Sequence, residues 1–217
     1  MAPATIKDLA RELKLSPSTI SRALRDHPDI SPKTKKRVVS LAEERDYHPD
    51  SIAQSLQTKK TKTIGVIVPE IKQPFFAAAI NGIEELAYAA GYTIIVCQSN
   101  ETADREVLVT RSLGSDRVAG LLVSLSRNTN NLDHFKVLQR RGVPIVFFDR
   151  VSNDIEASKV VVDDYKGAFD LVAHLIKSGY KRIAHLAGPK NLSISKFRLK
   201  GYMDAVSYTH LTLPTTL

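Results

Sequence analysis

Several residue types are scarce in this 217-residue chain. It has one cysteine, Cys97, two methionines and no tryptophan. A single cysteine cannot form a disulfide within the chain, so the composition favours a reducing, cytoplasmic location. No segment approaches the roughly 18 consecutive apolar residues of a membrane-spanning helix, and the first residues lack the pattern of a signal peptide. We therefore expect neither a disulfide-stabilised secreted domain nor a membrane protein.

Positive charge is concentrated near the N-terminus. Residues 1–62 contain 13 Lys and Arg against 8 Asp and Glu, whereas the remaining 155 residues contain 18 against 15. Hydrophobic residues make up 43% of the chain, which is enough for a packed core. The uneven charge favours a polyanionic partner for the N-terminal part, although an ordinary solvated basic surface would have the same composition.

Three short helices are predicted in the first 49 residues. Thr5 and Asp8 have the spacing of a capping box, ahead of apolar residues at helical spacing. The dipeptides Ser16-Pro17 and Ser31-Pro32 each combine a capping serine with a proline suited to the first helical position. A tight break separates the first two helices, which is typical of a helix-turn-helix unit.

The second of these helices has an outward face of small polar residues, in the stretch SPSTISRAL (residues 16–24). In a helix-turn-helix unit the second helix enters the major groove of DNA with its N-terminal side chains against the base edges. Arg22 has the reach for a bidentate contact with guanine. A small helical interaction domain is the alternative at this point.

The remainder of the chain alternates between apolar strands and helices. Strands are expected at 63–69, 92–97, 118–124, 145–149, 159–164 and 182–188, with helices at 75–90, 103–113, 132–141, 166–178 and from about Ile194. Apolar strands that alternate with helices favour a parallel sheet covered on both faces. Ligands of such sheets bind beyond the carboxyl ends of the strands. This rule selects Gln73, Phe75, Ser124, Asp149, Arg150 and Asp163.

The segment TIKDLARELKLSPSTISRALRDHPDISPKTKKRVVSLAEERDYHPDSIAQSLQT resembles the DNA-binding headpiece of the LacI/GalR family of bacterial transcription regulators. The resemblance implies that the second helix reads double-stranded operator DNA, and that PDSIAQSLQT is a hinge helix that wedges Leu56 into the minor groove. The implied base-reading residues are Pro17, Ser18, Arg22 and Leu56. The implied contacts with the DNA backbone are Thr5, Ser16, Thr19, Ser21, Ser31, Thr34 and Tyr47.

The segments VPEIKQPFF, FFDR, VVDDYKGA and HLAGPKNLSISKFRLKGY resemble the effector module of the same family, which is related to periplasmic binding proteins. The resemblance implies a small-molecule effector, carbohydrate-like, held by Arg198 with Asp149 beside it. It also implies a homodimer in the full-length protein. The expected effector contacts are Gln73, Phe75, Ser124, Asp149, Asp163 and Arg198.

The expected fold is an all-α helix-turn-helix headpiece with a hinge helix, followed by an incomplete α/β, periplasmic-binding-protein-like (type I) parallel-sheet domain. The expected boundaries are 1–49 for the headpiece, 50–62 for the hinge helix and linker, 63–162 for the N-terminal lobe and 163–205 for the start of the C-terminal lobe. Residues 206–217, VSYTHLTLPTTL, resemble a translated sequencing adapter. We expect this tail to have no biological role and the true protein to continue beyond Ala205, a natural short variant being the alternative.

The sequence therefore predicts a sequence-specific transcriptional regulator, a repressor, that acts on the nucleoid in the cytoplasm and has no cofactor. No Gly-rich phosphate loop is found, and the histidines lack metal-ligand spacing. The alternative is a sugar-binding or sugar-modifying protein with an incidental basic arm. An enzyme would need an acid/base pair, and Asp149 has no evident partner for that role.

Overall fold

The structure, a computed structural model, describes residues 4–47 and 61–211, with side chains up to Ser207. It divides into two compact units, residues 1–59 and 60–217. The predicted hinge helix, with Leu56, lies outside the described residues. None of the described helices combines the length and the apolar character that crossing a bilayer requires.

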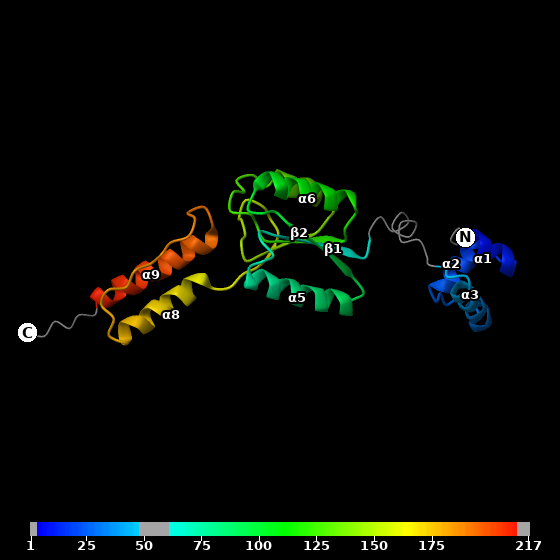
Figure 1. Ribbon diagram of the computed structural model, residues 1–217, viewed down its shortest axis with the longest axis horizontal. Helices are drawn as coiled ribbons and strands as arrows, with labels where there is room; N and C mark the ends of the chain where they lie inside the picture. Colours follow the sequence, from blue (N-terminus) through cyan, green and yellow to red (C-terminus); the bar gives the residue numbers. More distant parts are fainter. Residues whose placement is uncertain (1–3, 48–60, 212–217) are drawn as a thin grey trace, which may run out of the picture. The chain divides into compact units, whose positions relative to one another are not determined.

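The first unit is a bundle of three short helices, α1 (Ile6–Leu13), α2 (Pro17–Leu24) and α3 (Pro32–Glu44) (Figure 1). The predicted start signals are confirmed: Thr5 and Asp8 form a capping box, and Ser16 and Ser31 cap α2 and α3 ahead of a proline. Lys14 ends α1 in the left-handed region, with φ of 56°, which makes the tight turn before α2. The core consists of Leu9, Ala10, Ile20, Ala23, Ile30, Val38, Leu41 and Ala42.

The second unit contains a five-stranded parallel sheet in the order β2-β1-β3-β4-β5. The predicted parallel sheet is therefore confirmed, and helices α5 and α6 cover its opposite faces (Figure 1). The elements of this unit are β1 (Thr63–Val68), α5 (Pro74–Ala89), β2 (Thr93–Gln98), α6 (Ala103–Ser115), β3 (Gly120–Val123), α7 (Asp133–Arg140), β4 (Ile145–Phe148), β5 (Ser158–Val160), α8 (Asp164–Lys177) and α9 (Ser193–Leu211).

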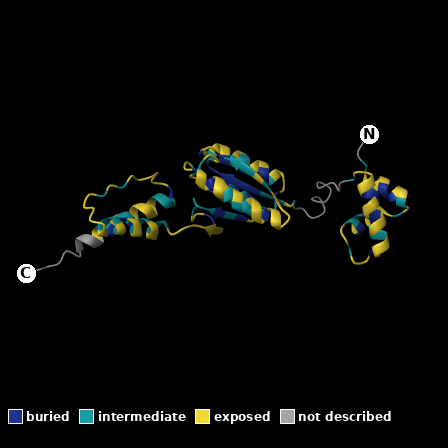
Figure 2. Ribbon diagram, turned by 60° about the horizontal axis from the view of Figure 1, so that its bottom comes forward, coloured by how far each residue is buried: buried dark blue, intermediate teal, exposed yellow. Residues whose placement is uncertain are grey.

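Both faces of the interior strand β1, which lies between β2 and β3, are buried, which explains its continuous apolar sequence (Figure 2). Ile67 belongs to the core on the side of α6 and α7, together with Phe135 and Phe147. Its neighbours Val66 and Val68 pack on the opposite face against Phe76 of α5. The sheet is thus packed on both faces, and the carboxyl ends of its strands position the loops that follow.

Helices α8 and α9 pack closely against each other. Gly201 of α9 is buried at this contact, and a Cβ atom there would overlap the carbonyl oxygen of Tyr165 in α8. Tyr165 Oη also donates to Asp204 Oδ2 at 3.0 Å. The α9 helix continues to Leu211, so its backbone extends six residues into the segment 206–217.

The prediction of a strand at 182–188 is wrong. Tyr202 Oη donates to the carbonyl oxygen of Ile183 at 2.9 Å, and the ring of His185 stacks on Tyr202, while Leu186 is 97% exposed. The segment runs along α9 without becoming a strand because no described strand lies beside it to satisfy its backbone.

The strand predicted at 159–164 is shorter than expected and begins one residue earlier. It ends at Val160, whose carbonyl oxygen accepts from the backbone N–H of Asp149 at 3.1 Å. Val161 and Val162 leave the sheet and are exposed, and Asp163 caps α8 by accepting from the N–H of Lys166 at 2.8 Å. The edge strand therefore stops where the chain turns away to form the rim of a cavity.

Candidate nucleic-acid interface and ligand cleft

The N-terminal half of α2 presents an exposed polar surface. Pro17, Ser18 and Arg22 are exposed, whereas Ile20 and Ala23 on the other face are buried in the headpiece core. The Arg22 guanidinium makes no hydrogen bond or ion pair with any described side chain. An arginine held on a packed helix without an internal partner is available to an external acceptor, such as a guanine edge.

Three of the residues predicted to contact the DNA backbone are helix N-caps. Thr5 Oγ1 accepts from the N–H of Asp8 at 3.3 Å, Ser16 Oγ from that of Thr19 at 3.1 Å and Ser31 Oγ from that of Thr34 at 3.3 Å. A helix N-terminus carries partial positive charge and free N–H groups, which suits a phosphate. The hydroxyls of Thr19 and Thr34 lie 2.8 and 2.9 Å from those of Ser16 and Ser31, while Ser21 and Tyr47 are half-buried.

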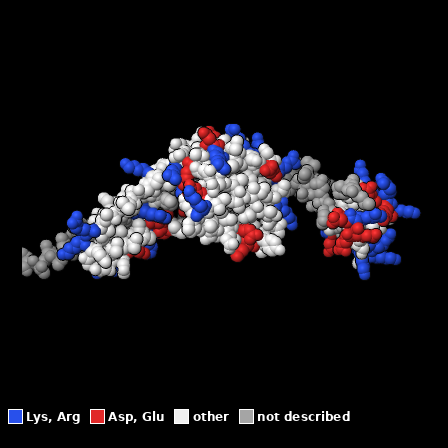
Figure 3. All heavy atoms as spheres, viewed as in Figure 1, with Lys and Arg blue, Asp and Glu red and all other residues white. Residues whose placement is uncertain are grey.

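The headpiece also carries positive charge that acidic residues do not neutralise (Figure 3). Lys35 pairs with Asp26 at 2.6 Å, and Arg45 pairs with Glu12 at 2.8 Å. Other cations of this unit make no ion pair within residues 4–47, the part of the unit that the structure describes: Lys7, Lys14, Arg22, Lys33, Lys36 and Arg37. Such a surface attracts a polyanion over a distance of about one Debye length, roughly 8 Å at physiological salt.

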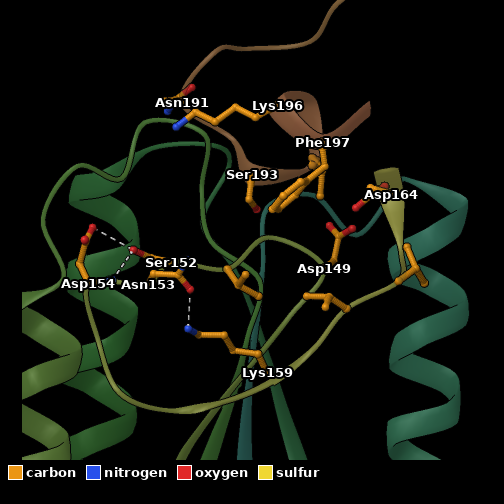
Figure 4. A pocket seen from close by; sticks show the side chains of 14 residues that line it. Asp149, Ser152, Asn153, Asp154, Lys159, Asp164, Asn191, Ser193, Lys196 and Phe197 are labelled. Carbon is orange, nitrogen blue, oxygen red and sulfur yellow. Dashed lines mark hydrogen bonds between the residues drawn. The ribbon is translucent and has the colours of Figure 1, made fainter. Parts of the chain in front are cut away.

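A cavity of about 540 Å³ lies beyond the carboxyl ends of β4 and β5 (Figure 4). Its walls come from the loop after β4, from β5 and the residues that follow it, and from the first turn of α9. This is where the strand-end rule predicts a ligand site. The lining residues are Asp149, Val151, Ser152, Asn153, Asp154, Lys159, Val161, Val162, Asp164, Asn191, Ser193, Ile194, Lys196 and Phe197.

Two carboxylates, those of Asp149 and Asp164, line one part of the cavity (Figure 4). Asp149 has a left-handed backbone, with φ of 57°, and accepts from Ser124 Oγ at 3.4 Å. Burial raises the pKa of Asp149 above its ordinary value, Arg150 opposes the shift, and Asp164 adds to it. Asp164 is paired with Arg198, whose Nε donates to Oδ1 at 2.7 Å.

The residue after Asp149 is held by a buried ion pair. Arg150 Nη1 donates to both carboxylate oxygens of Glu101 at 2.8 Å, and the N–H of Arg127 donates to Glu101 Oε2 at 2.8 Å. Burial raises the pKa of Glu101, but the hydrogen bonds from Arg150 and Arg127 outweigh that effect, so the pKa lies below its ordinary value. Arg150 Nε has no hydrogen-bond partner among the described residues and lies 3.9 Å from Asp149 Oδ2.

The structure brings together some of the predicted effector contacts. Asp149 lines the cavity, Ser124 supports it from behind, and Arg198 reaches the lining through its ion pair with Asp164. Gln73, Phe75 and Asp163 are outside the lining. Gln73 occupies the N-cap position of α5, where its side chain donates to Glu70 at 3.3 Å and makes no capping hydrogen bond to the helix. Phe75 is 53% exposed and packs edge-on against Phe76.

Sequence reasoning missed several lining residues, among them Lys159, Lys196, Phe197 and Asn191. Asn191 Nδ2 donates to the carbonyl oxygen of Arg127, which joins the segment before α9 to the loop after β3. Lys159 lies within β5, and the other three lie before α9 or in its first turn, so the strand-end rule reaches none of them. The proximity of Phe197 and Lys196 to Arg198 in the sequence was the available signal.

Comparison with known proteins gives two family matches. Residues 61–211 match the model of the periplasmic binding proteins and sugar binding domain of the LacI family, and residues 5–50 match that of the bacterial regulatory proteins of the lacI family. Together these two matches include nearly all of the described residues.

Individual relatives match along most of this chain. Catabolite control protein A of Priestia megaterium is 34% identical over 95% of this chain, and the transcriptional repressor PurR of Photobacterium profundum is 33% identical over 97%. Among solved structures, the lac repressor dimer bound to operator and the anti-inducer ONPF matches this chain with a TM-score of 0.80 and 24% sequence identity. The match covers 96% of this chain and 63% of the lac repressor chain, and it shows that the two share a fold. The chain spans 62% and 63% of the lengths of the two sequence relatives.

Proposed function

The chain belongs to the LacI family of bacterial regulatory proteins, and from that premise we propose that it is a sequence-specific DNA-binding transcriptional regulator, a repressor controlled by a small hydroxyl-rich effector. The observation that carries the proposal is the exposed face of α2, where Arg22 has no internal partner and three capped helix N-termini lie in the same small unit. The names of its relatives, which include the repressor PurR, support this direction of control.

We assign base reading to Pro17, Ser18 and Arg22, with Leu56 as the minor-groove wedge, and backbone contacts to the capping residues and their neighbours. Base contacts specify the sequence, whereas phosphate contacts fix the position of the headpiece on the duplex. The predicted backbone contacts are Thr5, Ser16, Thr19, Ser21, Ser31, Thr34 and Tyr47.

The effector would occupy the 540 Å³ cavity, whose volume lies within the usual range of about 300–1,000 Å³ for small-molecule sites. The carboxylate of Asp149 would accept hydrogen bonds from hydroxyl groups, and Phe197 would offer an apolar face to a sugar ring. Arg198, now paired with Asp164, would join the contacts if the effector draws its guanidinium inward. Because effector and DNA bind the same molecule, any coupling between the two affinities must be reciprocal.

A homodimer is part of this proposal. Apolar side chains are exposed on α5 and on the neighbouring edge strand β2: Leu86 is 77% exposed, Tyr88 is 78% exposed, and Ile95 is 39% exposed. A group of exposed apolar residues beside an unpaired strand edge favours association with another protein surface. A dimer would place two headpieces on two half-sites of one operator.

We propose regulation without catalysis, taking place where the chromosome is, in the cytoplasm. Asp149 is the half-buried carboxylate of the cleft that comes nearest to a proton-transfer role, and the second carboxylate beside it, that of Asp164, is engaged in an ion pair with Arg198 at 2.7 Å. We therefore expect the two carboxylates to accept hydrogen bonds from a ligand and not to act as an acid/base pair.

The test is selection of bound sequences from a random duplex library, followed by footprinting on the gene's own upstream region. A regulator is expected to enrich one motif and to protect a matching site at physiological salt. Arg22→Ala is the informative variant and Lys177→Ala, in the other unit, the control. Enrichment of no motif, together with binding of sugars by the wild-type protein, would favour the alternative of a sugar-binding protein with a basic arm.

A further inference from the structure

The C-terminal end of α2 is closed by two backbone hydrogen bonds. The N–H of His27 donates to the carbonyl oxygen of Arg22 at 3.0 Å, and the N–H of Asp26 donates to that of Ala23 at 3.1 Å. This pair of bonds is the Schellman motif, in which the residue after the helix has a left-handed backbone. Asp26 is that residue, with φ of 55°. The last turn of α2, which carries Arg22, is therefore held by the backbone conformation of Asp26.

Asp26 holds this conformation although it is not a glycine. For a residue with a Cβ atom the left-handed region carries a steric cost, and glycine, which escapes this cost, is the common residue at this position of a helix end. A contact that favours the left-handed backbone of Asp26 would offset the cost. The structure shows such a contact with α3, the next helix along the chain.

Lys35, near the start of α3, makes two contacts with Asp26. Its ammonium pairs with the carboxylate Oδ1 at 2.6 Å and also donates to the backbone carbonyl oxygen at 3.1 Å. The Lys35 side chain is only 21% exposed, whereas the neighbouring Lys36 is an exposed residue without an ion pair among the described residues of the headpiece. One cation thus holds both the side chain and the main chain of the residue that closes α2.

From this arrangement we propose that Lys35 is a positioning residue for sequence recognition. By holding Asp26, Lys35 fixes the last turn of α2 and with it the direction in which Arg22 meets the bases. The proposal rests on the base-reading role of Arg22 proposed above. A bidentate contact between arginine and guanine depends on the geometry of both partners, so a loosened turn weakens the reading of sequence more than the contacts with phosphates.

The first experiment measures DNA binding by the 217-residue chain, on the motif that the wild-type protein selects and on a scrambled duplex, at two salt concentrations. Lys35→Met keeps the aliphatic part of the side chain and removes the ammonium. We expect its affinity for the motif to fall about ten-fold and its affinity for the scrambled duplex much less, with the salt dependence unchanged. Lys36→Met removes the same charge from the neighbouring lysine and is the matched control, which should weaken both duplexes alike.

A second substitution, at position 26, tests whether Lys35 acts through the backbone. Glycine adopts the left-handed conformation without steric cost, so Lys35→Met combined with Asp26→Gly should regain most of the lost affinity for the motif. Lys35→Met combined with Asp26→Ala has the same net charge but keeps a Cβ atom, and it should not regain that affinity. The two double variants differ by a single methyl group, so charge cannot account for a difference between them.

Amide hydrogen exchange followed by NMR measures the end of α2 in the absence of DNA. In Lys35→Met the amide of His27 should exchange about ten-fold faster, because the turn that it closes opens more often. The amide of Leu9 in α1, which donates to the carbonyl oxygen of Thr5 at 3.2 Å, should be unchanged. Adding Asp26→Gly should slow the exchange of His27 again. Equal acceleration of both amides would show that Lys35 supports the whole headpiece and not this turn, and it would overturn the proposal.

Two binding results would also overturn it. Equal weakening of the motif and the scrambled duplex by Lys35→Met, with a lower salt dependence, would make Lys35 a phosphate contact. Recovery by the alanine double variant as complete as that by the glycine variant, or recovery by neither, would show that the backbone of Asp26 is not the route. If the wild-type protein selects no motif, the regulator function fails together with this proposal. If a motif is selected and the glycine variant fails to recover, the regulator function stands and only the positioning role is wrong.

Discussion

Arg150 and Glu101 form an ion pair in which Nη1 of Arg150 donates to both carboxylate oxygens of Glu101 at 2.8 Å. The pair joins the loop after β2 to the end of β4. The guanidinium also lies over the ring of Phe76, 5.9 Å from its centroid. Because Asp149 precedes Arg150 and has a left-handed backbone, the pair fixes the direction in which the Asp149 side chain enters the cavity. The Glu101–Arg150 pair is therefore the support of the cleft's acidic end.

Removing one partner of this pair should be costly. In Glu101→Ala the guanidinium of Arg150 remains buried without its acid, and the loss of folding stability is expected to be about 3–5 kcal/mol. Urea unfolding followed by circular dichroism measures the change. Glu156→Ala, at an exposed glutamate on the loop between β4 and β5, is the control and should change stability by less than about 0.5 kcal/mol. A Glu101→Ala variant as stable as the control would show that the pair does not support the fold.

Glu101 and Asp149 should titrate in opposite directions from their ordinary values. Burial raises the pKa of both, but the hydrogen bonds of Arg150 and Arg127 reverse the shift at Glu101 alone. A depressed pKa means that Glu101 contributes stability above its unfolded-state pKa, and this contribution is lost as the pH falls through the folded-state value. The raised pKa of Asp149 has the opposite sign, because the folded state favours its protonated form and stability falls as the pH rises from its unfolded-state to its folded-state pKa.

Carboxyl carbon-13 titration by NMR measures both groups in one experiment. The midpoint of Glu101 is expected below the ordinary value of a glutamate, and the midpoint of Asp149 above the ordinary value of an aspartate. In Arg150→Gln the midpoint of Glu101 should move upward, since its main hydrogen-bond donor is lost. Unchanged midpoints in that variant would contradict the role given to Arg150.

Ser16 should contribute to headpiece stability as well as to DNA binding. Its Oγ accepts from the N–H of Thr19 at 3.1 Å, so Ser16→Ala removes an N-cap and is expected to cost about 1 kcal/mol. Ser16→Asp keeps a capping acceptor but adds negative charge at the proposed phosphate contact. The aspartate variant should therefore unfold like the wild-type protein in urea and still bind duplex DNA more weakly. Wild-type affinity in that variant would rule out a phosphate near Ser16.

Much of the fold could be predicted because local signals and burial agree. The three capped helices follow from Thr5, Ser16 and Ser31, and the buried strand β1 from its continuous apolar sequence. The segment 182–188, RIAHLAG, also contains several apolar residues, but a strand needs a neighbouring strand as well, and the local sequence does not show whether one is present. Residues 163–205 contain only this one candidate strand. The segment therefore has no neighbouring strand, in the part of the chain that the structure describes, with which to form backbone hydrogen bonds.

The cleft was harder to predict than the fold. Its lining comes from three separate segments, and its support depends on contacts between residues about 50 positions apart, such as Glu101 and Arg150. Glu106 is a second example: it is fully buried and accepts from Ser126, Thr129 and His134 in the loop after β3 and the start of α7. In the sequence both glutamates resemble ordinary surface charges, because their partners become neighbours only when parallel strands end at one edge of the sheet.

Arg22→Ala should separate DNA recognition from folding. The Arg22 guanidinium contacts no described side chain, so its removal should leave the urea midpoint of the headpiece within about 0.5 kcal/mol of wild type. If Arg22 reads a guanine, the same variant should lose about 1–3 kcal/mol of affinity for the selected motif and become tolerant of substitution at one base pair. Lys36→Ala, at an exposed lysine on α3, is the comparison, because a residue that contacts only phosphate weakens all sequences alike and lowers the salt dependence. Fluorescence anisotropy on the motif and on a scrambled duplex, at two salt concentrations, measures the loss of affinity for each sequence and the salt dependence of binding. Equal losses on the two duplexes for Arg22→Ala would show that α2 holds the DNA backbone and that the sequence is read elsewhere.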